Sequence, residues 1–251
     1  LPMHEAVSSS AIDLGLLEGL TDRVRDVGGT LQLQVTAIGS ASDPHFDGTV
    51  DVSNGRFVVA VTGARYHNAR MALDLKRDQV TVKTLHVEDA RGRALDLTGS
   101  LGTHELKVGS VAVAVRAKQF EVMRNEFGTT EVDADLNLGG QFESPRLTGT
   151  IAITGGELKV DEILDRVLLR PYATQAGPAA ANGDLDLDPL AVLNPWDRMG
   201  LDLAVRTRGT LRMIGDNVQV SSGTPLGLGN VSVRAFGEIY LYKDPVQPLF
   251  V

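Results

Sequence analysis

Two stretches of this 251-residue chain carry the same pattern: GSASDPHFDGTVDVSNGRF at 39–57 and GQFESPRLTGTIAITGGEL at 140–158. The offset between them is 101 residues, from Gly39 to Gly140. Their first glycine, their proline and the Gly-Thr pair coincide, and valine and phenylalanine in the first stretch become isoleucine and leucine in the second. Glycine and proline mark turns and strand entries, and alternating apolar residues mark half-buried strands. The repeat therefore predicts a strand unit that occurs at least twice.

The same period-two alternation extends over most of the chain. It is clear in 31–35, 72–75, 80–82, 94–97, 132–138 and 201–203. Turn formers stand between these runs, and Asn54-Gly55, Gly139-Gly140 and Gly155-Gly156 predict short hairpins. The fold class expected is all-β: an elongated, curled antiparallel sheet, shaped as a β-taco or half-pipe groove and built from repeated strand units, with one or two short amphipathic helices.

Two segments depart from the strand pattern. Apolar residues from Ile12 to Val27 recur at helical spacing, with Ser10 as a candidate N-cap and Gly28-Gly29 as a candidate end. A second, shorter stripe at 163–168 is closed by Pro171. We predict a helix at each place.

Composition shifts suggest how the chain is organised. We expect an N-terminal helix segment at 1–28, two repeated β units at about 29–128 and 129–172, a Gly/Ala/Pro-rich linker or loop at 173–183, and a third β unit at 184–251. Pro248-Leu249-Phe250 resembles the sequence at Pro44 and Pro145, where a proline begins the strand that follows a turn. We therefore expect the third unit to be truncated and the chain to be an excerpt of a longer array.

Charge and composition exclude several function classes. The net charge is −8, and no cluster of basic residues is present, which disfavours electrostatic binding to nucleic acid or to an anionic bilayer. Cysteine is absent, so disulfides and thiolate chemistry are excluded. No apolar run approaches the ~18 residues of a membrane span. Aromatic residues make up only 5% of a chain that is otherwise rich in aliphatic ones.

The apolar face of such a sheet must be covered, either by a second sheet in a sandwich or by curling around something else. The one-dimensional repeat and the shortage of aromatic anchors favour the curled sheet. A smooth aliphatic face suits flexible acyl chains. The residues expected to line a lipid groove are Leu31, Leu33, Val35, Val50, Val52, Leu73, Leu75, Leu136, Leu138, Ile151, Ile153, Leu201 and Leu203.

No motif indicates catalysis. The run beginning His104-Glu105 has Val108 where a zinc protease needs its second histidine, and the acidic run 184–188 lacks the glycine and glutamate of a calcium loop. The five histidines form no recognisable constellation. We therefore expect no enzyme activity, no catalytic residue, no metal and no cofactor.

The repeat units, together with 195–203, 211–215 and 237–243, resemble the TamB family, the inner-membrane-anchored subunit of the translocation and assembly module, with AsmA-like and bridge-like lipid-transfer relatives. The resemblance covers essentially the whole chain. It implies a groove that projects across the periplasm, an inner-membrane anchor outside this chain, membranes at both ends of the full-length protein, and an outer-membrane barrel partner of the TamA type. No catalytic residues are implied.

Three functions remain open from the sequence. The first is a non-enzymatic conduit that carries phospholipid acyl chains between inner and outer membranes. The alternative is a chaperone-like scaffold for outer-membrane protein assembly, in which an exposed sheet edge templates a client strand. A structural β-solenoid spacer is the third, and it would bury its aliphatic face completely.

Overall fold

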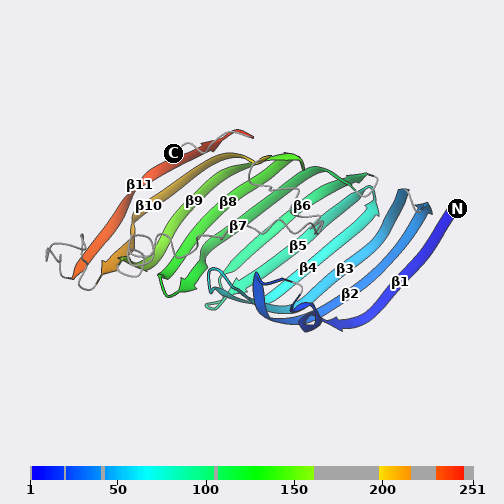
Figure 1. The fold of residues 1–251 in the computed structure, drawn as a ribbon, viewed down its shortest axis with the longest axis horizontal. Helices are drawn as coiled ribbons and strands as arrows, with labels where there is room; N and C mark the ends of the chain where they lie inside the picture. The colour runs from blue at the N-terminus through cyan, green and yellow to red at the C-terminus, as the bar shows by residue number, and fades with distance from the viewer. Residues whose placement is uncertain are drawn as a thin grey trace, which may run out of the picture.

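The chain folds into one sheet of eleven strands whose order in space is their order in the sequence (Figure 1). The structure is a computed structural model and describes residues 2–19, 21–40, 43–104, 107–160, 198–215 and 230–245. The strands are β1 (Pro2–Asp13), β2 (Val24–Ser40), β3 (Asp43–Val59), β4 (Arg65–Arg77), β5 (Gln79–Asp89), β6 (Ala94–His104), β7 (Lys107–Asn125), β8 (Gly128–Gln141), β9 (Ser144–Lys159), β10 (Gly200–Gly215) and β11 (Val231–Lys243). The predicted all-β, elongated and curled sheet is confirmed.

The sheet is open and single-layered over the described residues. β1 and β11 are its two edges and lie at opposite ends of the molecule, so the sheet does not close into a barrel (Figure 1). No second described sheet packs on it, which rules out the sandwich for this part of the chain. One face of a long aliphatic sheet therefore has no protein layer over it among the described residues.

One strand pair departs from the antiparallel sheet that the sequence predicts. β9 and β10 are parallel, with Leu147 beside Leu201 and Gly149 beside Leu203, whereas the other nine pairs are antiparallel. A parallel pair needs a long connection, because the chain must return to the edge where the first strand began. The stretch between Lys159 and Gly200 is long enough to do so, and its path, the linker at 173–183 and the predicted helix at 163–168 lie outside the described residues.

The internal repeat is visible in the strand register. Gly39 pairs with Pro44 in the β2–β3 hairpin, and Gly140 pairs with Pro145 in the β8–β9 hairpin, at the same 101-residue offset. A Cβ on Gly48 would lie 2.0 Å from the Gln34 carbonyl oxygen, and a Cβ on Gly149 would lie 2.1 Å from the Asp135 carbonyl oxygen. Both glycines have positive φ, 151° and 135°. The repeat is thus a pair of equivalent hairpins, each with a glycine where two backbones approach closely.

Two of the predicted hairpin turns are instead bulges within long strands. Asn54-Gly55 lies inside β3, where the pairing with β4 shifts register between Val52 and Gly55, and Asn54 has φ 52°. Gly155-Gly156 lies inside β9, beside Thr154, the extra residue at which the β8–β9 register shifts. Bulges bend a strand and increase its twist without ending it. Here the Gly-containing pairs bend strands of 16 and 17 residues rather than reversing them.

The N-terminal helix prediction is wrong. Pro2–Asp13 is strand β1, Leu14–Leu17 is a single 3₁₀ turn, and β2 already begins at Val24. Gly15 and Gly19 interrupt any helix, and the Asp13 carboxylate accepts a hydrogen bond from the Gly15 N–H at 2.8 Å and thereby caps the short turn. Pairing of β1 with β2 overrides the helical spacing of the apolar residues.

The close approach at Gly149 yields a stability test. Gly149→Ala should lower the free energy of unfolding by about 1–3 kcal/mol, since the methyl group meets a backbone oxygen and φ is positive. Gly139→Ala is the matched control, because its Cβ would have only the Val111 carbonyl oxygen near it, at 3.9 Å. Urea unfolding of both variants measures the difference. Equal stability of the two would contradict this account of the repeat.

Candidate functional site: an apolar trough

The strand register places aliphatic side chains in continuous rows across one face of the sheet. Residues that pair directly across strands project to the same face. Row 1 consists of Leu33, Val50, Leu73, Val82, Gly99, Val113, Leu138, Leu147 and Leu201. Row 2 consists of Leu31, Val52, Met71, Leu85, Leu97, Val115, Leu136, Gly149, Leu203 and Leu241.

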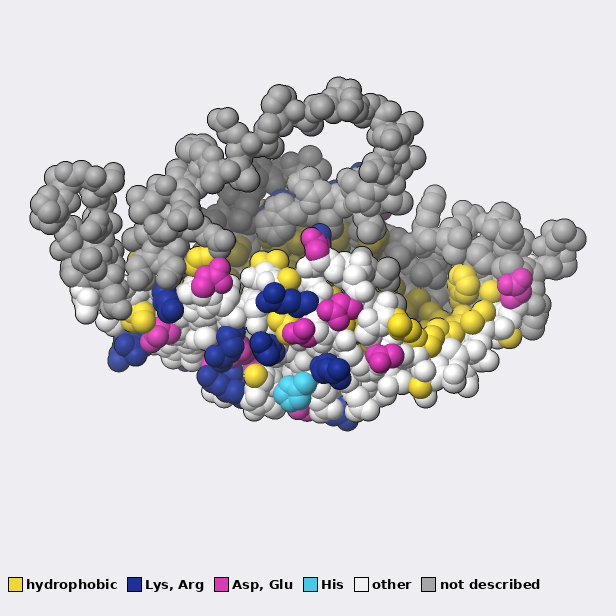
Figure 2. Space-filling model, turned by 60° about the horizontal axis from the view of Figure 1, so that its bottom comes forward, with side chains coloured by type: hydrophobic (Ala, Val, Ile, Leu, Met, Phe, Trp, Pro, Cys, Tyr) yellow, Lys and Arg dark blue, Asp and Glu magenta, His cyan; other side chains and the backbone are white. Residues whose placement is uncertain are grey.

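Two further rows flank these. Row 3 consists of Val35, Gly48, Leu75, Val80, Leu101, Val111 and Gly140. Row 4 consists of Val87, Leu95, Ala117, Ala134, Ile151, Val205 and Ile239. None of the four rows contains an ionisable side chain from β2 to β10, whereas at the β11 end of Row 1 Leu201 pairs with the buried Lys243. We call this face the inner face, because Figure 2 shows hydrophobic side chains in the hollow of the curved sheet and charged ones over its bulging side.

Twelve of the thirteen residues predicted from the sequence to line a groove lie in the four rows, and Ile153 projects to the same face of β9 as Ile151. Most of them are half-buried rather than buried, whereas Leu201 and Leu203 are only 2% and 6% exposed. The structure therefore brings the predicted residues together on one surface. Whether that surface contacts lipid stays a prediction.

Sequence reasoning missed several members of the rows. Val80 and Val82 alternate in phase with each other, but the next inward residues are Leu85 and Val87, because the β5–β6 pairing shifts register between Val82 and Leu85. In the sequence, the step of three residues from Val82 to Leu85, in place of the usual two, indicates this register shift. Val113, Val115 and Leu147 were missed although they follow the same alternation.

The opposite, outer face is polar. Cross-strand pairs there include Asp74 with Lys83 at 3.3 Å, Arg116 with Asp135 at 3.9 Å, and His86 with Asp96 at 2.7 Å. Hydrogen bonds to the carboxylates of Asp96 and then Glu88 raise the pKa of His86. The two faces of the sheet thus differ in chemistry along its length.

An aromatic cluster lies at one rim of the trough, which is the side where the β3–β4, β5–β6 and β7–β8 turns lie. Tyr66 on β4 stacks on Phe120 on β7 with ring centroids 5.0 Å apart, and Phe57 on β3 meets Tyr66 edge-on at 5.4 Å. In a flat sheet β4 and β7 would lie ~14 Å apart. Tyr66 and Phe120 meet because the β5–β6 hairpin between their strands is short. β4 and β7 bend toward each other over the end of this hairpin. Phe120, at 2% exposure, packs there with Val87 and Ala117.

A buried carboxylate ties this rim together. Asp89, which is fully buried, accepts hydrogen bonds from the N–H groups of Arg91 (2.8 Å), Arg93 (3.0 Å) and Glu121 (2.9 Å) and from Arg93 Nε (2.9 Å). Arg93 also donates to Glu131 at 2.6 Å. Asp89 therefore joins the β5–β6 turn to β7, and Arg93 joins that turn to β8.

The charges of this rim shift the pKa values of their neighbours. Burial by itself raises the pKa of Asp89, but the backbone N–H groups of Arg93, Glu121 and Arg91 and the charge of Arg93 outweigh it, and the pKa lies below its usual value. Burial, reinforced by the charges of Glu121 and Asp89, raises the pKa of Tyr66 to about 12. Asp89 is therefore a permanent anion near neutral pH and Tyr66 a permanent hydroxyl, which donates to the Glu121 carbonyl at 3.0 Å.

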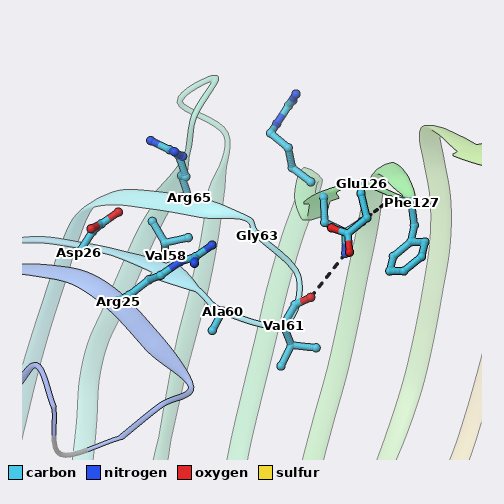
Figure 3. A pocket seen from close by; sticks show the side chains of 11 residues that line it. Arg25, Asp26, Val58, Ala60, Val61, Gly63, Arg65, Glu126 and Phe127 are labelled. Atoms are coloured by element: carbon cyan, nitrogen blue, oxygen red, sulfur yellow. Dashed lines mark hydrogen bonds between the residues drawn. The ribbon is translucent and has the colours of Figure 1, made fainter. Parts of the chain in front are cut away.

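An open cleft of about 770 Å³ lies beside this rim, between the β3–β4 and β7–β8 turns (Figure 3). The turns touch where Asn125 donates to the Val61 carbonyl at 3.5 Å. Arg25, Arg65 and Arg124 line the cleft together with the acidic residues Asp26 and Glu126. Charges of both signs share the cleft, so it has no strong preference for an anion. The aliphatic inner face is the stronger candidate site.

Other sequence motifs take ordinary structural places. In the His104-Glu105 run, His104 is the last residue of β6 and Lys107 the first of β7, and the two residues between them lie outside the described residues. The acidic run 184–188 lies outside the described residues. Among the described residues, no cluster of metal-ligating side chains occurs, and no helix is long and apolar enough to cross a bilayer.

Replacing Asp89 tests the rim. Asp89→Asn should lower the free energy of unfolding by about 3–5 kcal/mol, because it removes one partner of a buried charged network. The lowered pKa of Asp89 means that its contribution is complete above pH ~4 and is lost as pH falls through the lower, folded-state value. That acid-dependent part should disappear in the variant. Chemical unfolding at a series of pH values measures both effects.

Asp51→Asn, on the exposed outer face of β3, is the control and should change stability by no more than ~0.5 kcal/mol. If both variants were equally stable at neutral pH, the rim network would not be a stabilising element.

Comparison with known proteins identifies one family. The family model described as the TamB C-terminal domain matches residues 83–248. Searches among curated proteins and among solved structures give no match. The matched range includes β6–β11 and most of β5, with the parallel β9–β10 pair and the second copy of the repeat. Because the match covers more than half of the chain, the chain belongs to the TamB family.

Proposed function

We propose that this chain is a non-enzymatic segment of a periplasmic lipid conduit, in which phospholipid acyl chains lie along the inner face between the inner and outer membranes. TamB proteins belong to the cell envelope and are associated with outer-membrane assembly machinery. The observation that carries the proposal is the uncharged, half-exposed aliphatic inner face that runs from β2 to β10.

The dimensions of the rows fit extended acyl chains. Neighbouring strands are ~4.8 Å apart, so the nine strands from β2 to β10 extend over ~38 Å along the trough. Rows two residues apart along a strand are separated by ~6.7 Å. Several rows side by side give a width that accommodates more than one chain. A lipid lying across the strands would therefore meet methyl groups along its whole length.

The chemistry of the lining favours sliding over tight binding. Each methylene removed from water contributes about 0.8 kcal/mol, wherever along the rows it is buried. No polar group within the rows anchors a headgroup at one position. An acyl chain would thus be held on the trough with little preference for any one strand. Such a uniform surface supports transport better than storage.

The parallel strand pair does not interrupt the lining. Leu147 on β9 lies beside Leu201 on β10, and Ile151 lies beside Val205, so Rows 1 and 4 continue across the junction. Row 2 continues through Gly149 beside Leu203. The one change of strand direction therefore keeps the apolar face intact.

Native mass spectrometry of the purified chain tests the conduit. We expect co-purified phospholipid with the wild-type chain and its loss, by at least about tenfold, in Leu136→Asp/Ile151→Arg, because a charge in an apolar lining costs several kcal/mol. Asn137→Asp/Thr150→Arg is the matched control: it makes the same kinds of change on the same two strands, on the outer face. The control should retain lipid. Wild-type protein free of lipid, or equal loss in both variants, would refute the conduit.

A second function is favoured by a separate observation, the open edge of β11. This strand pairs only with β10, so the backbone groups along its other side have no strand partner among the described residues. An unpaired edge can accept a further strand through main-chain hydrogen bonds. The edge would suit a chaperone-like scaffold that templates a client strand for a TamA-type barrel.

Hydrogen exchange tests this second function. A synthetic amphipathic peptide from an outer-membrane barrel strand should slow amide exchange in Val231–Lys243, and Ile239→Lys should weaken the effect, since charges on an edge strand oppose pairing. The β1 edge, Pro2–Asp13, provides the internal comparison. Unchanged exchange in β11 at saturating peptide would exclude strand templating there.

A further inference from the structure

Exposed apolar side chains concentrate on one strand. Of the ten large hydrophobic residues that are exposed among the described ones, five lie on β11: Val233, Phe236, Ile239, Tyr240 and Tyr242. Phe236 and Tyr240 are 72% and 63% exposed. Aromatic residues are scarce in this chain, so their grouping on one exposed strand calls for an explanation beyond core packing.

The three rings share the outer face. Tyr240 pairs with Ala204 and Tyr242 with Asp202, both on the side opposite to Leu201 and Leu203. Phe236 projects the same way, because β11 itself contains no bulge between these residues. Elsewhere the outer face is polar. The rings therefore belong neither to the trough nor to the core.

Arginines lie beside these rings, and the acidic residues among them already have partners, because Glu238 pairs with Arg206 and Asp244 accepts a hydrogen bond from the Tyr242 hydroxyl. Arg208 pairs with Phe236, and Arg212 lies directly opposite Arg234. Like charges opposite each other on a sheet are destabilising. Arg212 has one acidic neighbour, Glu157 at 3.6 Å, while Arg208 and Arg234 form no ion pair within the described part of the chain. This arrangement is suited to an anion that comes from outside the sheet.

The net charge of this end of the molecule also differs from that of the whole. Residues 198–215 and 230–245 contain six cationic and three acidic side chains, a net charge of +3 in a chain of net charge −8. Figure 2 shows Lys and Arg side chains beside hydrophobic ones at the left end of the molecule, where Figure 1 places β10 and β11. The sequence does not display a basic cluster, because the residues come from two strands.

We propose that this outer face of β10 and β11 docks on the surface of an anionic lipid bilayer. The terminal patch consists of Arg208, Arg212, Arg234, Phe236, Tyr240 and Tyr242. Tyrosine rings with polar tips settle at the level of lipid headgroups, and guanidinium groups pair with lipid phosphates. The docking goes beyond the lipid conduit and does not require it, although it would bring the β10–β11 side of the described sheet to a membrane.

The patch lies on the bilayer rather than in it. Among the described residues, one side of β11 has no strand partner, and its backbone N–H and C=O groups cannot be satisfied by hydrocarbon, so insertion past the headgroups is unfavourable. Ile239 and Val233 are exposed on the inner face of the same strand and point away from the docked surface. An acidic protein segment would pair with the arginines but would leave the three rings in water. A bilayer surface would contact the arginines through its phosphates and the rings through its headgroup region.

Vesicle co-sedimentation tests the patch. The full chain should bind vesicles of phosphatidylcholine containing phosphatidylglycerol, should bind pure phosphatidylcholine vesicles far less, and should be released by added salt. Arg208→Gln/Arg234→Gln should weaken binding roughly 30-fold, as each cation near an anionic surface contributes ~1 kcal/mol. Phe236→Ser/Tyr240→Ser should weaken it as well.

The control is Arg116→Gln/Phe142→Ser, which removes one exposed arginine and one exposed ring outside the terminal patch. It should bind as the wild type does. Circular dichroism shows whether each variant is folded. If a patch variant fails to fold, the dependence of wild-type binding on salt and on anionic lipid still tests the proposal.

Three results would overturn the proposal: no binding of the wild type to anionic vesicles, equal weakening by control and patch variants, or salt-sensitive binding to an acidic polypeptide in place of vesicles. The trough variant Leu136→Asp/Ile151→Arg separates the two proposals, because it should lose co-purified lipid and still sediment with anionic vesicles.

Discussion

Cross-strand register is the constraint on which this molecule depends. Side chains alternate between the two faces of a strand, so a slip of one residue in any pair would turn an entire row of leucines and valines toward the outer face. Eight successive pairings keep the inward residues of β2 to β10 aligned, including the parallel pair. An aliphatic surface shared by nine strands results. The lipid conduit that we propose needs this alignment more than it needs any single residue.

Curvature and closure of the rim come from local exceptions to the regular ladder. Register shifts near Asn54 and Gly155 bend long strands that could otherwise remain flat. Gly48 and Gly149 allow the neighbouring backbone to approach where any side chain would collide with a carbonyl oxygen. At the rim, the short β5–β6 hairpin lets Tyr66 meet Phe120, and buried Asp89 fixes the turn beneath them. Six of the described aromatic residues are thus divided between one structural cluster and the exposed strand β11, while Phe46, Phe127 and Phe142 lie elsewhere.

The two faces of the sheet support different interactions. The inner face is uncharged and uniform, and an acyl chain on it gains from burial alone. The outer face is polar along most of the sheet, yet at β10 and β11 it combines arginine with exposed rings. A docking surface at one end of a trough and a carrying surface along it are compatible, since they use opposite sides of the same strands. Family membership, through the TamB C-terminal domain, is consistent with a role at the envelope membranes.

The all-β class, the repeat and the thirteen inward residues were all predictable from the amino-acid sequence, because period-two alternation and glycine placement are local properties of a strand. Other features required the folded sheet. The segment Ile12–Val27 has helical spacing but contributes to β1 and β2, since pairing with a neighbour outweighs weak local preference. The direction of β10 depends on a long connection whose composition does not specify it. The arginines and rings of the terminal patch are up to 34 residues apart, from Arg208 to Tyr242, and only the pairing of β10 with β11 brings them onto one face.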